Sequence, residues 1–387
     1  MYSKNIKLLA LSMISMDSSF SIGVFVVFMI LMGLSLAEVS MVVAGFLLCS
    51  SLFQIPAGVF ADRFGNKVSL LIGAILMTFG FGLFAFADNF YIFLAGYSLL
   101  GSGQAMKGGA DVAFIYNDLK LLDKERDFKK IYGKIEFNLN MFWVFASISG
   151  GFLYVLNPRL PFLIEFILSI SSIFLIIFLK EKPVNNRKVK VFDHLKKSLK
   201  FAFKTPKFSK VFVFSALIGS LALVTFQYLQ PFYVEMGINQ KYFGVIAAIT
   251  FVFRALGALK SDAVGKIFNV DRYLVLHSLV FTLFLMLFGV LKQTFILISI
   301  VSIFYFLRGL YNPTVSNFIN QKVNDANRST MLSVNSQFLT IFSSLILLLT
   351  GFVSESFGLE SVFFLIAVLS NLFLILYVVS LRNVEAG

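Results

Sequence analysis

Long apolar runs separated by short polar stretches repeat along the whole chain. A helix needs about 20 apolar residues to cross the hydrocarbon core of a bilayer, and uninterrupted runs of that length favour helices over the alternating pattern of strands. We therefore predict an all-α membrane protein with twelve transmembrane helices. They are expected near residues 8–32, 39–61, 68–87, 91–116, 131–156 and 161–179, and then near 211–234, 242–259, 273–291, 295–312, 329–353 and 362–380.

Composition supports a membrane protein and disfavours an enzyme. Of the 387 residues 58% are hydrophobic and only 14% are charged, against roughly 25% charged in an ordinary soluble domain. One cysteine and two histidines leave no basis for a disulfide framework or a histidine-rich metal centre. A phosphate-binding G-x-x-x-x-G-K-[ST] pattern is also missing, so ATP hydrolysis is not expected. We expect no cofactor. The expected energy source is an ion gradient, in the first place a proton gradient.

Basic residues are distributed in a way that predicts topology. The net charge is +13, but about 27 of the 33 Lys and Arg residues fall on the side of the predicted helices that holds both termini. Only Arg159, Lys241 and Lys292 are assigned to the opposite side. Excess Lys and Arg mark cytoplasmic loops. We therefore expect a multi-pass protein of the cell (inner or plasma) membrane with cytoplasmic termini, in contact with lipid rather than nucleic acid.

A basic segment divides the chain into two sets of six helices. Residues 1–180 form the predicted N-terminal bundle, 181–210 a cytoplasmic linker, and 211–387 the C-terminal bundle. Apolar and basic residues from Val191 to Lys204 recur at near-helical spacing. This spacing is compatible with an amphipathic helix on the anionic inner leaflet, and equally with a disordered basic linker.

A polar turn between the second and third runs carries the most specific motif. It reads Gly58-Val-Phe-Ala-Asp62-Arg63-Phe64-Gly65-Asn66-Lys67. Burying its charges in lipid would cost several kcal/mol each, so the turn must leave the hydrocarbon. The motif resembles the pattern G-x-x-x-D-R-x-G-x-[RK] found between the second and third helices of the major facilitator superfamily. A shorter version, Asp262-x-x-Gly265-Lys266, recurs 200 residues later.

This resemblance implies two six-helix halves that rock about a central site, which opens to one side at a time. In the family, the Asp and Arg of this loop contribute to a contact between the halves that stabilises the outward-open state. Carried over, that role falls to Asp62, Arg63 and Lys67, whereas Gly58 and Gly65 would allow the tight turn.

Asp17 is the foremost candidate for transport chemistry. It lies about nine residues into the first predicted helix, roughly 14 Å deep, among several serines. A carboxylate away from water favours its protonated form. Asp17 could therefore bind and release a proton as the cavity opens to either side, or it could bind substrate. The alternative is a fixed structural group held by hydroxyls or a basic partner.

Other ionisable residues in the first half form a second group of candidates. Lys107 and Asp111 lie four apart on one helix face and can pair, either statically or as part of proton coupling. Tyr97 stands where the family often has Arg. Glu136 lies near the cytoplasmic end of the fifth helix, before an Ala146-to-Gly151 segment that resembles a degraded form of the family's antiporter pattern. For Glu165 we expect an interfacial or structural role.

The second half offers cations and amides. Arg254 and Arg308 fall inside predicted helices, where a buried cation needs Asp17, Glu136 or an anionic substrate as partner, unless its side chain snorkels to the interface. Gln227 and Gln230 form a polar patch that could line the cavity.

Together these features favour a proton-coupled exporter of small apolar or amphipathic compounds, similar to the multidrug efflux branch of the family and working as a monomer. One alternative is a narrow-specificity permease for a sugar, siderophore, peptide or metabolite. Another is a membrane receptor or scaffold that transports nothing, against which the intact loop motif and the buried acids argue.

Overall fold

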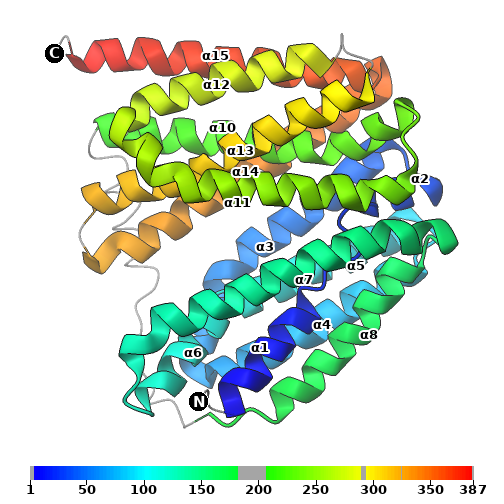
Figure 1. The fold of residues 1–387 in the computed structure, drawn as a ribbon, viewed down its shortest axis with the longest axis vertical. Helices are drawn as coiled ribbons and strands as arrows, with labels where there is room; N and C mark the ends of the chain where they lie inside the picture. Colours follow the sequence, from blue (N-terminus) through cyan, green and yellow to red (C-terminus); the bar gives the residue numbers. More distant parts are fainter. Residues whose placement is uncertain (1–3, 182–205, 289–292, 324, 386–387) are drawn as a thin grey trace. The chain divides into compact units, whose positions relative to one another are not determined.

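The computed structural model describes residues 4–181, 206–288, 293–323 and 325–385. Apart from two short 3-10 turns, η1 (Glu125–Asp127) and η2 (Gln240–Tyr242), the elements in this part of the chain are α-helices. Figure 1 shows their course. They are α1 (Lys4–Met16), α2 (Phe25–Leu31), α3 (Leu36–Phe64), α4 (Asn66–Phe86), α5 (Phe90–Lys107), α6 (Ala110–Lys120), α7 (Phe128–Leu156), α8 (Leu160–Ile177), α10 (Pro206–Glu235), α11 (Phe243–Ile267), α12 (Val270–Phe288), α13 (Thr294–Lys322), α14 (Asp325–Phe357) and α15 (Leu359–Glu385).

Ten of the described helical stretches are long and apolar enough to cross a membrane. They correspond to ten of the twelve predicted runs. The other two runs, 8–32 and 91–116, do not form continuous helices. The first is split into α1 and α2, and the second is split into α5 and α6. The prediction of unbroken helices was therefore wrong in these two places.

The chain folds into two compact units. One comprises residues 1–189 together with 239–248, and the other comprises 190–238 and 249–387. Each is described here by itself. The predicted amphipathic segment from Val191 to Lys204 lies outside the described residues.

In the first unit α5 packs between α3 and α4, and α8 packs on α4 and α1. The backbones of α3 and α5 approach closely, because a Cβ atom on Gly101 would overlap the carbonyl oxygen of Phe46. Glycine is thus required for this helix crossing. Buried Leu, Ile, Met and Phe side chains of α1, α4, α6 and α7 form the adjoining core.

The loop motif adopts a tighter structure than the predicted turn. Helix α3 continues through Asp62 and Arg63 to Phe64, and α4 begins at Asn66. Gly65 alone makes the connection, with φ of 98°, a left-handed conformation that L side chains rarely adopt. Gly58 lies inside α3, and a Cβ atom there would meet nothing within 4 Å. The prediction that Gly58 shapes the turn was therefore wrong.

In the second unit α10 packs against α14 and α15, and α12 packs against α15 and α13. Helices α11 and α13 cross at a pair of glycines. A Cβ atom on Gly257 would overlap the Phe306 carbonyl oxygen, and one on Gly309 would overlap that of Arg254. The shorter motif of this unit lies inside α11, where Lys266 and Asp262 form an exposed ion pair of 3.4 Å.

Candidate transport cavity

The first broken span places a polar, non-helical segment inside the first unit. Residues 17–24 separate α1 from α2, and this segment is rich in serine. Serine hydroxyls compete for backbone carbonyls and so disfavour a regular helix. Here the Ser18 Oγ donates to the carbonyl oxygen of Ser15, and the Ser19 Oγ donates to that of Asp17, both over 3.1 Å.

The second broken span is interrupted directly after a cation, Lys107. Helix α5 stops at Lys107, and Gly109 has a φ of 85°, a left-handed conformation, before α6 begins. Two successive glycines after Lys107 therefore turn the chain between the two helices. The side chain of Lys107 is only 6% exposed.

The two breaks meet through an ion pair. The Nζ of Lys107 donates to the Oδ2 of Asp17, whose side chain is 10% exposed. A charge removed from water is costly unless it is paired, and this contact leaves neither side chain buried without an oppositely charged partner. The predicted partner of Lys107 was Asp111. Asp111 is buried at the first turn of α6 and accepts a 2.7 Å bond from the Val112 backbone N–H, so the predicted pairing was wrong.

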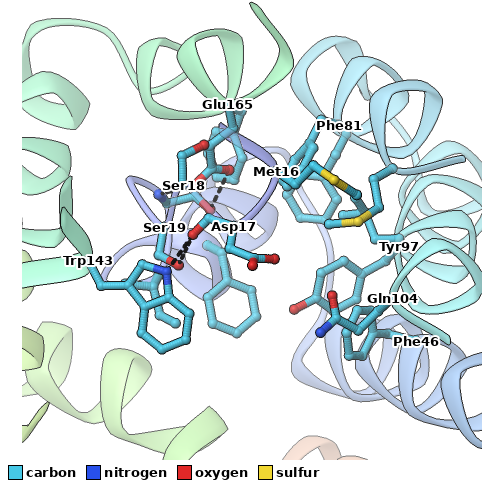
Figure 2. A pocket seen from close by; sticks show the side chains of 17 residues that line it. Met16, Asp17, Ser18, Ser19, Phe46, Phe81, Tyr97, Gln104, Trp143 and Glu165 are labelled. Carbon is cyan, nitrogen blue, oxygen red and sulfur yellow. Dashed lines mark hydrogen bonds between the residues drawn. The ribbon is translucent and has the colours of Figure 1, made fainter. Parts of the chain in front are cut away.

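A cavity of about 210 Å³ lies next to this ion pair, within the first unit. Figure 2 shows Asp17, Tyr97 and Gln104 around the same space, with Trp143 on the far side of Asp17. Its wall is mostly aromatic and sulfur-bearing. The lining residues are Met16, Asp17, Ser18, Ser19, Ser21, Ile22, Phe25, Phe46, Met77, Phe81, Phe84, Tyr97, Leu100, Gln104, Trp143, Phe162 and Glu165.

Neighbouring helices hold the 17–24 segment from two sides. On α7, the indole N–H of Trp143 donates to the Asp17 carbonyl oxygen over 2.6 Å. Further along α7, a Cβ atom on Gly150 would overlap the Phe20 carbonyl oxygen, so the two backbones touch. On α8, both Glu165 carboxylate oxygens accept bonds from Ser21. The segment is thus fixed although it is not helical.

Glu165 has a more central place than the sequence indicated. It was expected at the interface or in a structural role, but its side chain is 1% exposed and lines the cavity. Sequence reasoning also missed Trp143 as a cavity residue. The usable signal was that Glu165, like Asp17, is an ionisable residue inside a predicted membrane-spanning helix.

The remaining candidates of the first unit lie outside the cavity wall. Glu136 is half-buried on α7, where the Asn140 amide donates to its backbone carbonyl over 2.7 Å. In the loop motif, Asp62 and Arg63 do not line the cavity, and Arg63 is exposed. The Nζ of Lys67 donates to the Ile177 carbonyl oxygen over 2.8 Å, at the end of α8.

In the second unit the predicted cations find carbonyl and aromatic neighbours. Arg308 is half-buried, and its Nη1 donates to the Ala222 carbonyl oxygen over 2.9 Å. Arg254 is exposed at the surface of the described residues and lies over the Phe251 ring. Gln230 is 4% exposed, and the Oε1 of Gln227 is buried without a hydrogen-bond partner. Neither glutamine belongs to the cavity of the first unit.

Comparison with known proteins places this architecture. A sequence model described as the Major Facilitator Superfamily matches residues 8–336. The chain belongs to the Major Facilitator Superfamily. It is therefore a multi-pass membrane transporter rather than an enzyme, and the family resemblance drawn from its loop motif is confirmed.

Relatives and solved structures show how far this similarity extends. An uncharacterized MFS-type transporter, YxaM of Bacillus subtilis (strain 168), is 25% identical over 341 residues, which cover 85% of this chain and 83% of the relative. The quinolone resistance protein NorA of Staphylococcus aureus (strain MRSA252) is 22% identical over 308 residues, covering 76% and 75%.

Among solved structures, the nucleoside transporter NupG superposes with a TM-score of 0.81 at 15% identity, covering 98% of each chain. A D-xylose-proton symporter superposes with a TM-score of 0.70 at 14% identity, covering 96% of each chain. These two likenesses show the superfamily fold, whereas their differing substrates leave specificity open.

Proposed function

We propose that this superfamily transporter is a proton-coupled exporter of small apolar or amphipathic compounds that works by alternating access. The observation that carries the proposal is the juxtaposition of an aromatic wall with a buried ion pair. Seven of the lining residues, Phe25, Phe46, Phe81, Phe84, Tyr97, Trp143 and Phe162, are aromatic, and rings of this kind bind apolar and cationic compounds by dispersion and cation–π attraction. Similarity to NorA, a quinolone resistance protein, supports export, because removing a drug from the cell can confer resistance to it.

The ion pair supplies a coupling element. When Asp17 takes up a proton it loses its attraction for Lys107, and a buried lysine without a partner becomes costly. Either the α1–α2 break or the α5–α6 break must then rearrange to give the ammonium group another partner. A proton thereby changes the shape of the wall that holds the substrate, which alternating access requires. Asp111 and Glu136 would tune this step by their charges, whereas Lys107 takes part in it directly.

Size limits what the cavity holds. Its volume of about 210 Å³ is below the roughly 300–1,000 Å³ of sites that enclose drug-sized ligands. In the state described, it would receive one ring or one end of an amphipathic compound. The full substrate site would need further residues, for which Gln227, Gln230, Arg254 and Arg308 of the second unit remain candidates.

The same proposal places the protein in the cell membrane, with both termini cytoplasmic, because Lys and Arg concentrate on that side. One chain already holds both compact units, so we propose a monomer. For Asp62, Arg63 and Lys67 we propose the family's role in stabilising the outward-open state.

The test is proton-driven movement of ethidium in vesicles that contain the purified protein and an acidic interior. The native protein is expected to accumulate the dye until a protonophore collapses the gradient, and Asp17→Asn is expected to lose the gradient-driven part. Asp88→Asn, which removes an exposed acid outside the cavity, is the matched control and should behave as native. If ethidium stays still with the native protein, export of amphipathic cations is contradicted, and a screen of sugars, peptides and nucleosides would test the narrow-specificity permease.

A further inference from the structure

Glu165 is a buried acid whose partners differ in kind from those of Asp17. Its Oε1 accepts from the Ser21 backbone N–H and its Oε2 accepts from the Ser21 hydroxyl, both over 2.8 Å. The Phe20 backbone N–H is a further donor. No Lys, Arg or His of the described residues lies within ion-pair distance of it. The carboxyl is thus held only by neutral donors, all from the non-helical segment.

The charged groups near Glu165 have other partners or do not reach it. The other titratable groups that line the cavity are Asp17, which is paired with Lys107, and the Tyr97 phenol of α5. Arg159 directly precedes α8, the helix of Glu165, but its guanidinium donates to the carbonyl oxygens of Ala85 and Ala87 over 2.6 and 3.2 Å. Glu165 can therefore change its charge without leaving a buried cation unpaired, which Asp17 cannot do.

Protonation at Oε2 would also have a definite structural consequence. The new O–H group must donate, so the Ser21 hydroxyl would change from donor to acceptor and need another partner for its own hydrogen. The backbone donors would then face a neutral oxygen, and hydrogen bonds to charged acceptors are roughly twice as strong as neutral ones. The clamp that α8 places on the 17–24 segment would weaken.

We propose that Glu165 is a second proton-binding site of the cavity, and that its protonation loosens the segment between α1 and α2. The inference deepens the proposed function, since a proton-driven cycle gives the site its use. It assigns separate tasks to the two acids. Protonation of Asp17 breaks its ion pair with Lys107, whereas protonation of Glu165 weakens the hydrogen bonds that hold the segment between α1 and α2.

The chain carries a natural reporter for this step. Its single tryptophan, Trp143, donates to the Asp17 carbonyl oxygen inside the same segment. The emission of the purified protein in lipid nanodiscs can be titrated between pH 5 and 9 without a label, a substrate or a gradient. We expect a pH-dependent change of emission in the native protein, one part of which is absent in Glu165→Gln and retained in Asp17→Asn.

Ser21→Ala separates a proton site from a merely structural carboxyl. It keeps the acid but removes a donor that favours the charged form, so the emission change should persist with its midpoint at higher pH. A flat emission profile in the native protein would overturn the proposal. So would an emission profile in Glu165→Gln that matches the native profile, whatever Asp17→Asn shows. The emission measurement needs no transport. Failure of ethidium export would therefore contradict the proposed function, whereas the emission profiles alone decide whether Glu165 binds a proton.

Discussion

The two units share a helical scaffold but differ in where they bury charge. In the first unit Lys107, Asp111, Asp118 and Glu165 are all buried. Among the described residues of the second unit, the only buried ionisable side chain of Lys, Arg, His, Asp or Glu is His277. Both spans broken by non-helical residues or glycines also belong to the first unit. Charge chemistry in the membrane therefore concentrates in one half.

The helix crossings show how similar scaffolds acquire different chemistry. Gly101 meets the Phe46 carbonyl oxygen in the first unit, and Gly309 meets that of Arg254 in the second, with the same spacing of 208 residues between equivalent positions. On this alignment Tyr97 corresponds to Tyr305. Phe46, a cavity residue, corresponds to a cation. Packing is thus repeated between the halves, whereas the residues that carry charge are not.

The largest effect on stability and transport is expected at the buried Asp17–Lys107 ion pair, which has no counterpart among the described residues of the second unit. Lys107→Met leaves Asp17 buried without its cation, and breaking a buried pair typically costs about 3–5 kcal/mol. Thermal unfolding of the purified variant in detergent should show a strongly lowered apparent Tm, together with loss of gradient-driven ethidium transport.

The double variant Asp17→Asn with Lys107→Met is the matched control, because it removes both charges and leaves none unpaired. It should recover most of the apparent Tm and none of the proton-driven transport. Recovery of transport would show that the pair serves packing alone. An unchanged Tm in the single Lys107 variant would contradict its burial cost.

Sequence reasoning recovered the scaffold better than the site, for reasons visible in particular residues. Run length predicts a span, so ten helices were placed correctly, but the breaks at residues 17–24 and at Gly109 depend on hydrogen bonds that length does not report. Lys107 and Asp111 lie four apart, which suggested a pair along one helix. The glycines between them end that helix, so Lys107 instead reached a residue 90 positions away.

The second-largest effect is expected at the glycine helix crossings that recur in both units. Gly101→Ala and Gly309→Ala should each lower the apparent Tm, since overpacking typically costs about 1–3 kcal/mol, to a similar extent in both units. Gly58→Ala is the control, because its added Cβ meets nothing within 4 Å and alanine is the better helix former. Its Tm should be unchanged or slightly higher. A large drop for Gly101→Ala with none for Gly309→Ala would mean that the repeat is not structural.

The smallest effects are expected at the two loop motifs, which differ in how an acid contacts them. In the first unit Glu181 accepts from the backbone N–H groups of Asn66 and Lys67 over 2.9 and 2.8 Å, and so satisfies donors at the start of α4. A carboxylate at a helix N-terminus contributes about 0.3–1 kcal/mol, and Glu181→Gln should lower the apparent Tm slightly.

In the second unit Asp262 and Lys266 pair across 3.4 Å but are 91% and 76% exposed. Exposed pairs contribute little, because water and salt screen both charges, so Asp262→Asn should leave the Tm unchanged. Measuring both variants at low and at high salt sharpens the comparison. The Glu181 effect should persist in high salt, because its carboxylate oxygens accept from specific backbone donors. If both variants instead behaved alike at each salt concentration, the carboxylate of Glu181 would contribute no more than a screened surface charge, and the two motifs would be energetically equivalent.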